Sequence, residues 1–108
     1  MQDANFEGSN LEGASFFDAK LKQTNLSNTN LTNATLDSSI MDGADLTNSI
    51  LVDAFVFNTQ FKDVTITGSD FTNVLLEKRQ LDYLCSIASG TNSISEKKTI
   101  ETLECNNL

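Results

Sequence analysis

The residues of this chain that could carry out chemistry are few in kind. The 108 residues include no histidine, so the side chain that most often serves as general base and as transition-metal ligand is absent. Fifteen carboxylates could form an acid–base pair, but such a pair needs burial or a shaped cleft to shift a pKa. No P-loop and no GxGxxG motif is present. We therefore expect no enzyme, no metal site and no cofactor.

The charge of the chain restricts its partners. The formal net charge is −8, and an acidic surface disfavours nucleic-acid backbones and anionic membranes. No apolar run approaches the roughly 20 residues of a membrane span, so we expect no direct membrane insertion. No basic start followed by an apolar stretch is present, and we expect a mature or trimmed form.

The elements that must position any site come from one repeating pattern, a large apolar residue at every fifth position. Two residues before each stands a smaller one, which is Ala, Ser, Thr or Val. A period of five matches neither the 3.6 of a helix nor the 2.0 of a strand, and it predicts a solenoid. The large centres are Phe6, Leu11, Phe16, Leu21, Leu26, Leu31, Leu36, Met41, Leu46, Leu51, Val56, Phe61, Ile66, Phe71 and Leu76.

The residue two positions after each centre predicts a corner. From Gly8 to Asn73 it is Gly, Asn or Asp at twelve of fourteen positions. These residues tolerate left-handed backbone conformations or make close local turns. We therefore expect the large and the small residue of each quintet to point inward and the other three to face water.

The quintets resemble a known family. Ala-Asp-Leu-Thr-Asn at 44–48 and Ala-Asn-Phe-Glu-Gly at 4–8 look like the pentapeptide-repeat pattern, which is roughly A(D/N)LXX. The match covers residues 4–78. The resemblance implies an all-β solenoid, a right-handed quadrilateral β-helix with four quintets in each coil.

After Leu76 the period changes to helical spacing. Apolar residues at i, i+3, i+4 and i+7 predict a helix over 77–89, with Gly90 as its C-cap. A second short helix should end near Cys105 and begin at Ser93, which opens a capping box, or at Thr99. We expect these helices to cover the end of the solenoid, because bare strand edges invite aggregation. The domains are then a β-helix at 1–78 and a C-terminal α-helical cap at 79–108.

The two cysteines, Cys85 and Cys105, both lie in this predicted cap. They could be reduced core thiols, a redox pair or a structural disulfide, and the even count favours the disulfide. The segments 84–92 and 99–105 resemble the pentapeptide-repeat proteins of the thylakoid lumen in plants and cyanobacteria, which end in a helical cap with a Cys pair. A disulfide requires an oxidising compartment, so the resemblance implies the thylakoid lumen, with a bacterial periplasm as the alternative.

Apolar residues at outward positions are the candidate interaction patch. Phe17, Phe55 and Phe57 fall on one face, and Ile50 and Val52 occupy neighbouring outward positions. One interpretation is that the chain itself covers them or that they are scattered surface residues. The other is that they bind a protein partner, because contiguous apolar surface marks interaction sites.

Two functions follow from these observations. The first is a non-catalytic structural and protein-interaction module, lumenal and associated with a photosynthetic complex or its assembly. The alternative, known for other pentapeptide-repeat proteins, is a DNA mimic that binds a topoisomerase. The expected partners are proteins, such as a thylakoid membrane complex on its lumenal side, and not nucleic acid.

Overall fold

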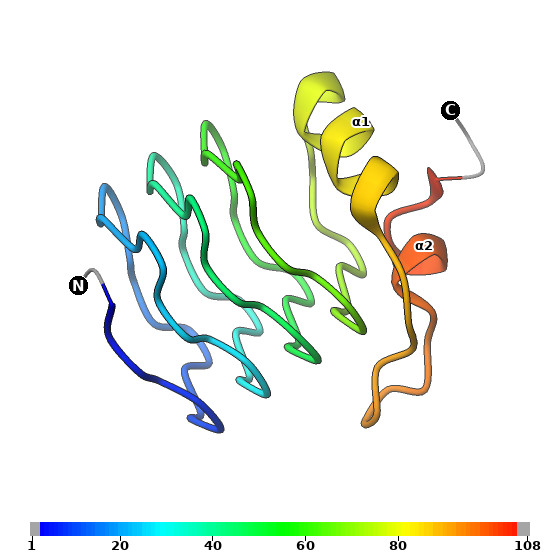
Figure 1. Ribbon diagram of the computed structural model, residues 1–108, viewed down its shortest axis with the longest axis horizontal. Helices are drawn as coiled ribbons and strands as arrows, with labels where there is room; N and C mark the ends of the chain where they lie inside the picture. The colour runs from blue at the N-terminus through cyan, green and yellow to red at the C-terminus, as the bar shows by residue number, and fades with distance from the viewer. Residues whose placement is uncertain (1–2, 106–108) are drawn as a thin grey trace.

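The computed structural model describes residues 3–105 and shows a stack of coils followed by two short helices (Figure 1). The molecule measures 34 × 27 × 22 Å, and the coils lie side by side along its longest axis. Helix α1 spans Lys78–Ile87 and helix α2 spans Thr99–Thr102. Both helices lie at the C-terminal end of the stack.

Successive coils are joined at a fixed register of twenty residues. Parallel bridges pair Asn5 with Asn25 at the start of the stack and Ile50 with Asp70 near its end. Backbone hydrogen bonds connect the coils at each bridge, as where the N–H of Leu51 donates to the carbonyl of Asp70 at 2.8 Å. Four quintets therefore complete one coil.

The sides of the coils are too short to form conventional strands. Within residues 3–105 the β structure consists of isolated bridges, because a corner every five residues leaves little extended backbone on each side. The coils form the expected β-helix solenoid, but its sides are single bridged residues rather than strands.

Every corner of the coils has a left-handed backbone conformation. The residue two positions after each centre has a φ between 56° and 74°, from Gly8 to Asn73. The next N–H closes a turn onto the carbonyl of the centre, as from Ala34 to Leu31 at 3.0 Å. A positive φ at the third residue of a four-residue turn is the signature of a type II turn. The prediction of a corner every five residues is confirmed, even at Gln23, where the side chain does not favour this conformation.

The centres fill the interior of the stack. From Phe16 to Phe71 each centre is at most 5% exposed, whereas the terminal centres Phe6, Leu11 and Leu76 are half-buried. Burying apolar surface stabilises a fold by about 25 cal/mol per Å², so these centres are the main stabilising element of the structure.

The smaller inward residues bring hydroxyl groups into the core without leaving them unpaired. The Oγ of Ser39 donates to the carbonyl of Leu36 at 2.6 Å, and the Oγ of Ser49 donates to that of Leu46 at 2.7 Å. Because a buried hydroxyl is costly only when it lacks a partner, Ser and Thr can replace Ala at these positions.

The outward residue before a centre closes a local hydrogen bond where it is Asn or Asp. The Oδ1 of Asn5 accepts from the N–H of Glu7 at 2.9 Å, and the Oδ1 of Asp45 accepts from the N–H of Thr47 at 2.9 Å. The preference for Asn and Asp here is a backbone requirement, because the side chain forms an Asx turn. The same bond is formed by Asn10, Asn25, Asn30 and Asp70.

Helix α1 starts close to its predicted position and ends earlier. Its N-cap is Glu77, whose N–H donates to the Oε1 of Gln80 at 3.0 Å in a capping box. The predicted C-cap at Gly90 is wrong, because the helix ends at Ile87 and its C-cap is Ala88. Gly90 has a φ of 81°, and a Cβ there would come within 3.0 Å of the backbone N of Gly68. The glycine therefore allows close approach to the last coil.

Helix α2 is shorter than either predicted version. Its N-cap is Lys98, so neither a capping box at Ser93 nor a cap at Thr99 forms. The residues after Asn92 instead turn around its side chain, whose Oδ1 accepts from the N–H groups of Ile94 and Ser95 at 2.9 Å. The side-chain hydrogen bonds of Asn92 therefore form a turn where the capping box predicted the start of a helix.

Two buried amide side chains of the C-terminal segment bind the last coil. The Nε2 of Gln80 donates to the carbonyls of Val56 and Thr59 at 2.9 and 3.0 Å. The Nδ2 of Asn92 donates to the carbonyl of Gly68 at 3.0 Å. The Val56 carbonyl also accepts from the N–H of Thr59 at 3.2 Å, so Gln80 adds a second donor to it.

Hydroxyl groups of the same segment accept from the last coil. The Tyr83 hydroxyl accepts from the N–H of Asp63 at 2.8 Å, and the Oγ1 of Thr102 accepts from the N–H of Phe71 at 3.0 Å. Donors and acceptors of the coil edge are therefore both satisfied from within the chain.

The inward and outward register predicts opposite effects for neighbouring changes in one quintet. Leu36→Asp buries a carboxylate where the wild-type side chain is 0% exposed, at a cost of several kcal/mol against a total stability of about 5–15. Thr35→Asp places the same carboxylate where the Asx turn forms, and the melting temperature should stay within a few degrees of wild type. Thermal melts followed by circular dichroism test the pair, and similar losses in both variants would show the register to be wrong.

Candidate interaction surface

One face of the coil stack exposes large apolar side chains to water. Its inward centres are Phe16, Leu36 and Val56. We call the exposed residues of this side the aromatic face. They are Phe17, Phe55, Phe57 and Leu75, which are 65%, 56%, 68% and 91% exposed.

The register of the coils arranges these side chains in two columns. Phe57 lies two coils beyond Phe17, about 10 Å away at one strand spacing per coil, with Asp37 between them. Leu75 follows Phe55 by twenty residues, and both line a groove of about 210 Å³. The four side chains therefore belong to one surface.

Both backbone polar groups of Phe55, beneath the aromatic face, form hydrogen bonds to the preceding coil. Its N–H donates to the carbonyl of Ala34 at 2.9 Å, and its carbonyl accepts from the N–H of Leu36 at 2.7 Å. Aromatic rings on a fixed backbone lose little conformational entropy on binding, which favours them as interface residues.

Phe55 lacks the local acceptor that Asn or Asp provides at the same position of other quintets, such as Asp45 and Asp70. Phe55 stands where Asn or Asp would accept the N–H two residues on, so it provides no acceptor for Phe57. The Oδ1 of Asp37, from the preceding coil, accepts that N–H at 2.8 Å instead. A carboxylate of another coil thus compensates for the aromatic residue.

The C-terminal segment does not cover the aromatic face within residues 3–105. The Oε1 of Glu77 accepts from the N–H of Asn58 at 3.2 Å, next to Phe57, yet the Phe57 side chain stays 68% exposed. Internal covering of Phe17, Phe55 and Phe57 is therefore wrong for the described part of the chain.

Ile50 and Val52 lie on the adjacent face and not among the phenylalanines. Both flank the inward Leu51, and both are half-buried. Ile50 is bridged to Asn30 and to Asp70. The structure thus separates these two residues from the aromatic face.

Leu75 is a member of the face that sequence reasoning missed. It is adjacent to the inward centre Leu76, and the break in the repeat follows directly. Counting twenty residues on from Phe55 would have found it.

The cysteines form one bond. Cys85, on α1, and Cys105, beyond α2, are joined by a disulfide with Cα atoms 5.7 Å apart. Neither is a free thiol, so no cysteine nucleophile is present. The bond ties α1 to the chain that follows α2.

Asp70 is a buried carboxylate with a structural environment. Burial acts to raise its pKa, but hydrogen bonds from the side chain and backbone of Thr72 and from Ser95, together with the charge of Lys97, hold the pKa below its usual range. Such a group stays ionised and is unsuited to general acid catalysis. Over residues 3–105, no group of three or more His, Cys, Asp or Glu residues could hold a metal ion.

No helix within the described range is long and apolar enough to span a bilayer.

In a comparison with family models, the chain matches the model described as "Pentapeptide repeats (8 copies)". The matches cover residues 1–37, 14–51 and 39–77.

Three of the similar proteins come from Arabidopsis thaliana and from a cyanobacterium. A crystal structure of a pentapeptide-repeat protein from the Arabidopsis thaliana thylakoid lumen is 44% identical, with a TM-score of 0.95, and the alignment covers 96% of this chain and 72% of that one. The thylakoid lumenal 15 kDa protein 1, chloroplastic, of Arabidopsis thaliana is 49% identical over 49 residues, which is 45% of this chain and only 22% of that protein. HetL, a pentapeptide-repeat protein involved in heterocyst differentiation regulation from the cyanobacterium Nostoc, is 24% identical with a TM-score of 0.70, covering 72% of this chain and 33% of that one. HetL supports the fold alone.

The missing local acceptor at Phe55 predicts an unusual effect on stability. Phe55→Asn should offer the Phe57 N–H an acceptor within its own quintet, and the free energy of unfolding should stay unchanged or rise by up to about 1 kcal/mol. The control is Phe61→Asn, which puts an amide at an inward centre that is 5% exposed and should cost about 3–5 kcal/mol. Chemical denaturation measures both, and a large loss for Phe55→Asn would make the exposed ring a structural residue.

Proposed function

The chain belongs to the pentapeptide-repeat family, and from this premise we propose that it is a non-catalytic protein-interaction module that binds its partner through the aromatic face. The observation that carries the proposal is a row of exposed apolar side chains on a hydrogen-bonded backbone. Contiguous apolar surface of this kind is typical of interaction sites.

In this module a coil unit at 1–78 presents the aromatic face, and residues 79–108 form a cap. The cap role is supported by the bonds of Gln80, Tyr83 and Asn92 to the last coil. An uncovered end would offer the edge groups of the last coil to another chain. Residues 1–2 and 106–108, the outer ends of the two units, lie outside the described residues.

The compartment we propose is the thylakoid lumen. A relative that is 44% identical over nearly the whole chain comes from that compartment. The disulfide between Cys85 and Cys105 agrees with it, because such bonds persist in oxidising compartments and are rare in the cytosol. The partner is then a protein reachable from the lumen, such as a photosynthetic membrane complex or a factor in its assembly.

Capture from thylakoid preparations tests the interaction. The immobilised wild-type chain should retain a defined set of lumenal or membrane proteins, and Phe17→Ser with Phe57→Ser should retain less than about a tenth of it. The melting temperature should stay within a few degrees, since both rings are exposed. The matched control, Glu12→Ser with Thr65→Ser, changes exposed residues of other faces and should capture normally. Equal retention by all three forms would contradict binding through the aromatic face.

The disulfide makes a separate prediction about the compartment. Protein purified from thylakoids without reductant should gain two hydrogens in intact mass on reduction. Replacing both cysteines by serine should cost about 3 kcal/mol, because the bond closes a loop with a sequence separation of 20. Free thiols in the native protein would contradict the oxidised state and weaken the case for the lumen.

A further inference from the structure

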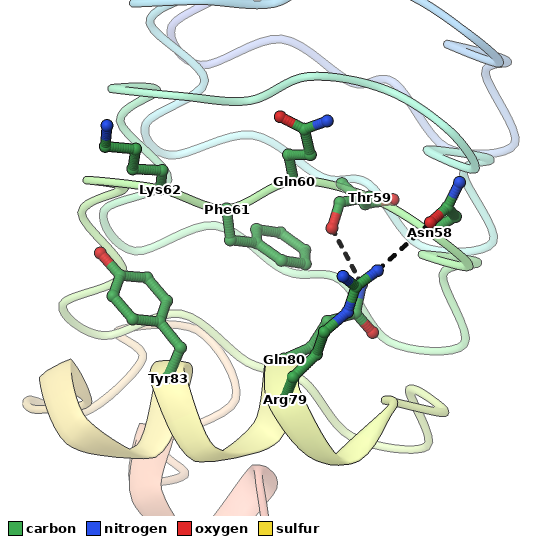
Figure 2. Close-up of a pocket in the computed structure, with 8 residues that line it drawn as sticks. All are labelled: Asn58, Thr59, Gln60, Phe61, Lys62, Arg79, Gln80 and Tyr83. Atoms are coloured by element: carbon green, nitrogen blue, oxygen red, sulfur yellow. Dashed lines mark hydrogen bonds between the residues drawn. The ribbon is translucent and has the colours of Figure 1, made fainter.

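A second candidate site lies in a cleft between the last full coil and α1. The cleft has a volume of about 440 Å³, within the range of ligand sites. Figure 2 shows Arg79 and Tyr83 reaching from α1 on either side of the Phe61 ring, with Gln60 and Lys62 on the coil opposite. The cleft shares no residue with the aromatic face.

Hydrogen-bond donors and positive charge dominate the polar groups of this cleft. The Nη2 of Arg79 donates to the Oδ1 of Asn58 at 3.3 Å, which holds the guanidinium over the cleft and leaves further N–H groups available. The hydroxyl oxygen of Tyr83 accepts from the N–H of Asp63, so its own proton remains free to donate. The cleft lining contains no carboxylate.

The charges of the cleft have no ion-pair partner among the described residues. Over residues 3–105, neither Lys62 nor Arg79 forms an ion pair, whereas Lys78 pairs with Asp82 at 2.9 Å. Figure 2 shows Lys62 at one end of the cleft and Arg79 at the other, with the Phe61 ring between them. Two cations in one cleft without an ion-pair partner are unusual in a chain with a net charge of −8. A carboxylate would complete the site, because guanidinium groups bind carboxylates in a bidentate geometry.

The positive charge continues beyond the cleft along the same side of the stack. We call this side the lysine face. It is the side with inward centres Leu21, Met41 and Phe61 and exposed Lys20, Lys22 and Lys62. Asp42 stands between Lys22 and Lys62 in their column, and its buried Oδ1 has no hydrogen-bond partner. The face therefore carries more positive than negative charge, while the molecule as a whole is acidic.

We propose that the cleft binds a short acidic peptide segment, with one carboxylate on Arg79 and a second on Lys62, and with Tyr83 as a hydrogen-bond donor. The segment then runs along the lysine face, where a further carboxylate meets Lys22. Lys22 and Lys62 are two coils apart, about 10 Å, which an extended peptide spans in about three residues. The net charge of −8 repels long polyanions and so favours a short segment over nucleic acid.

Titration of the ¹⁵N-labelled full chain with tetraglutamate, followed by NMR at low ionic strength, tests the site. Backbone signals of 60–62 and 79–83 should shift in a saturable way, and tetraserine should produce no shift. Lys62→Gln with Arg79→Gln should weaken the apparent affinity at least tenfold. Lys97→Gln with Lys98→Gln removes the same charge outside the cleft and should bind as wild type does. Melting temperatures of both variants establish that they are folded.

Each other result overturns the proposal. Equal weakening in the two variants would mean unspecific attraction, and displacement of tetraglutamate by an equal concentration of inorganic phosphate would mean a general anion site. Tighter binding of a short single-stranded oligonucleotide than of tetraglutamate would assign the cleft to nucleic acid. Because neither variant touches Phe17 or Phe57, capture through the aromatic face can succeed or fail independently of this outcome.

Discussion

The left-handed corner at every fifth residue is the constraint on which the rest of the structure depends. It returns the chain to its starting point after twenty residues, so that each side of a coil can hydrogen-bond to the same side of the next. Without the corner, inward centres such as Leu31 and Leu51 would not stack. The energy of the fold comes from burying those centres, but the corner decides which side chains can be buried. A coil this narrow accepts one large and one small residue on each side.

The same geometry makes the surface a set of columns. A residue and the one twenty positions later occupy the same column, so single substitutions in different repeats combine into one continuous feature. Phe17 and Phe57 combine in this way on the aromatic face, and Lys22 and Lys62 combine on the lysine face. The row of lysines also argues against a DNA mimic, which would need a continuous acidic surface.

The end of the stack has the opposite problem, because its last coil has no following coil to pair with. Gln80 and Asn92 are almost completely buried there, and each donates to carbonyls of the coil edge. Burying an amide is favourable only when its donors and acceptors find partners, and both do. Side chains of the C-terminal segment thus form hydrogen bonds to the coil edge in place of a following coil. The disulfide between Cys85 and Cys105 links the two parts of this segment.

The sequence by itself determined the repeating part of the protein. The corner, the inward centres and the outward positions of Phe17, Phe55 and Phe57 could be predicted because each depends on residues within one quintet and on the twenty-residue register. Whether the chain covers those rings could not be predicted, because covering depends on contacts with distant segments. The tertiary structure decided what depends on contacts far apart in the chain. Asp37 supports Phe57 from another coil, Leu75 extends the aromatic face, and the cleft at Arg79 exists only because α1 packs beside the coil. The ends of α1 and α2 were also decided there, because Asn92 and Gly90 fit against the last coil and local helix signals could not compete with those contacts.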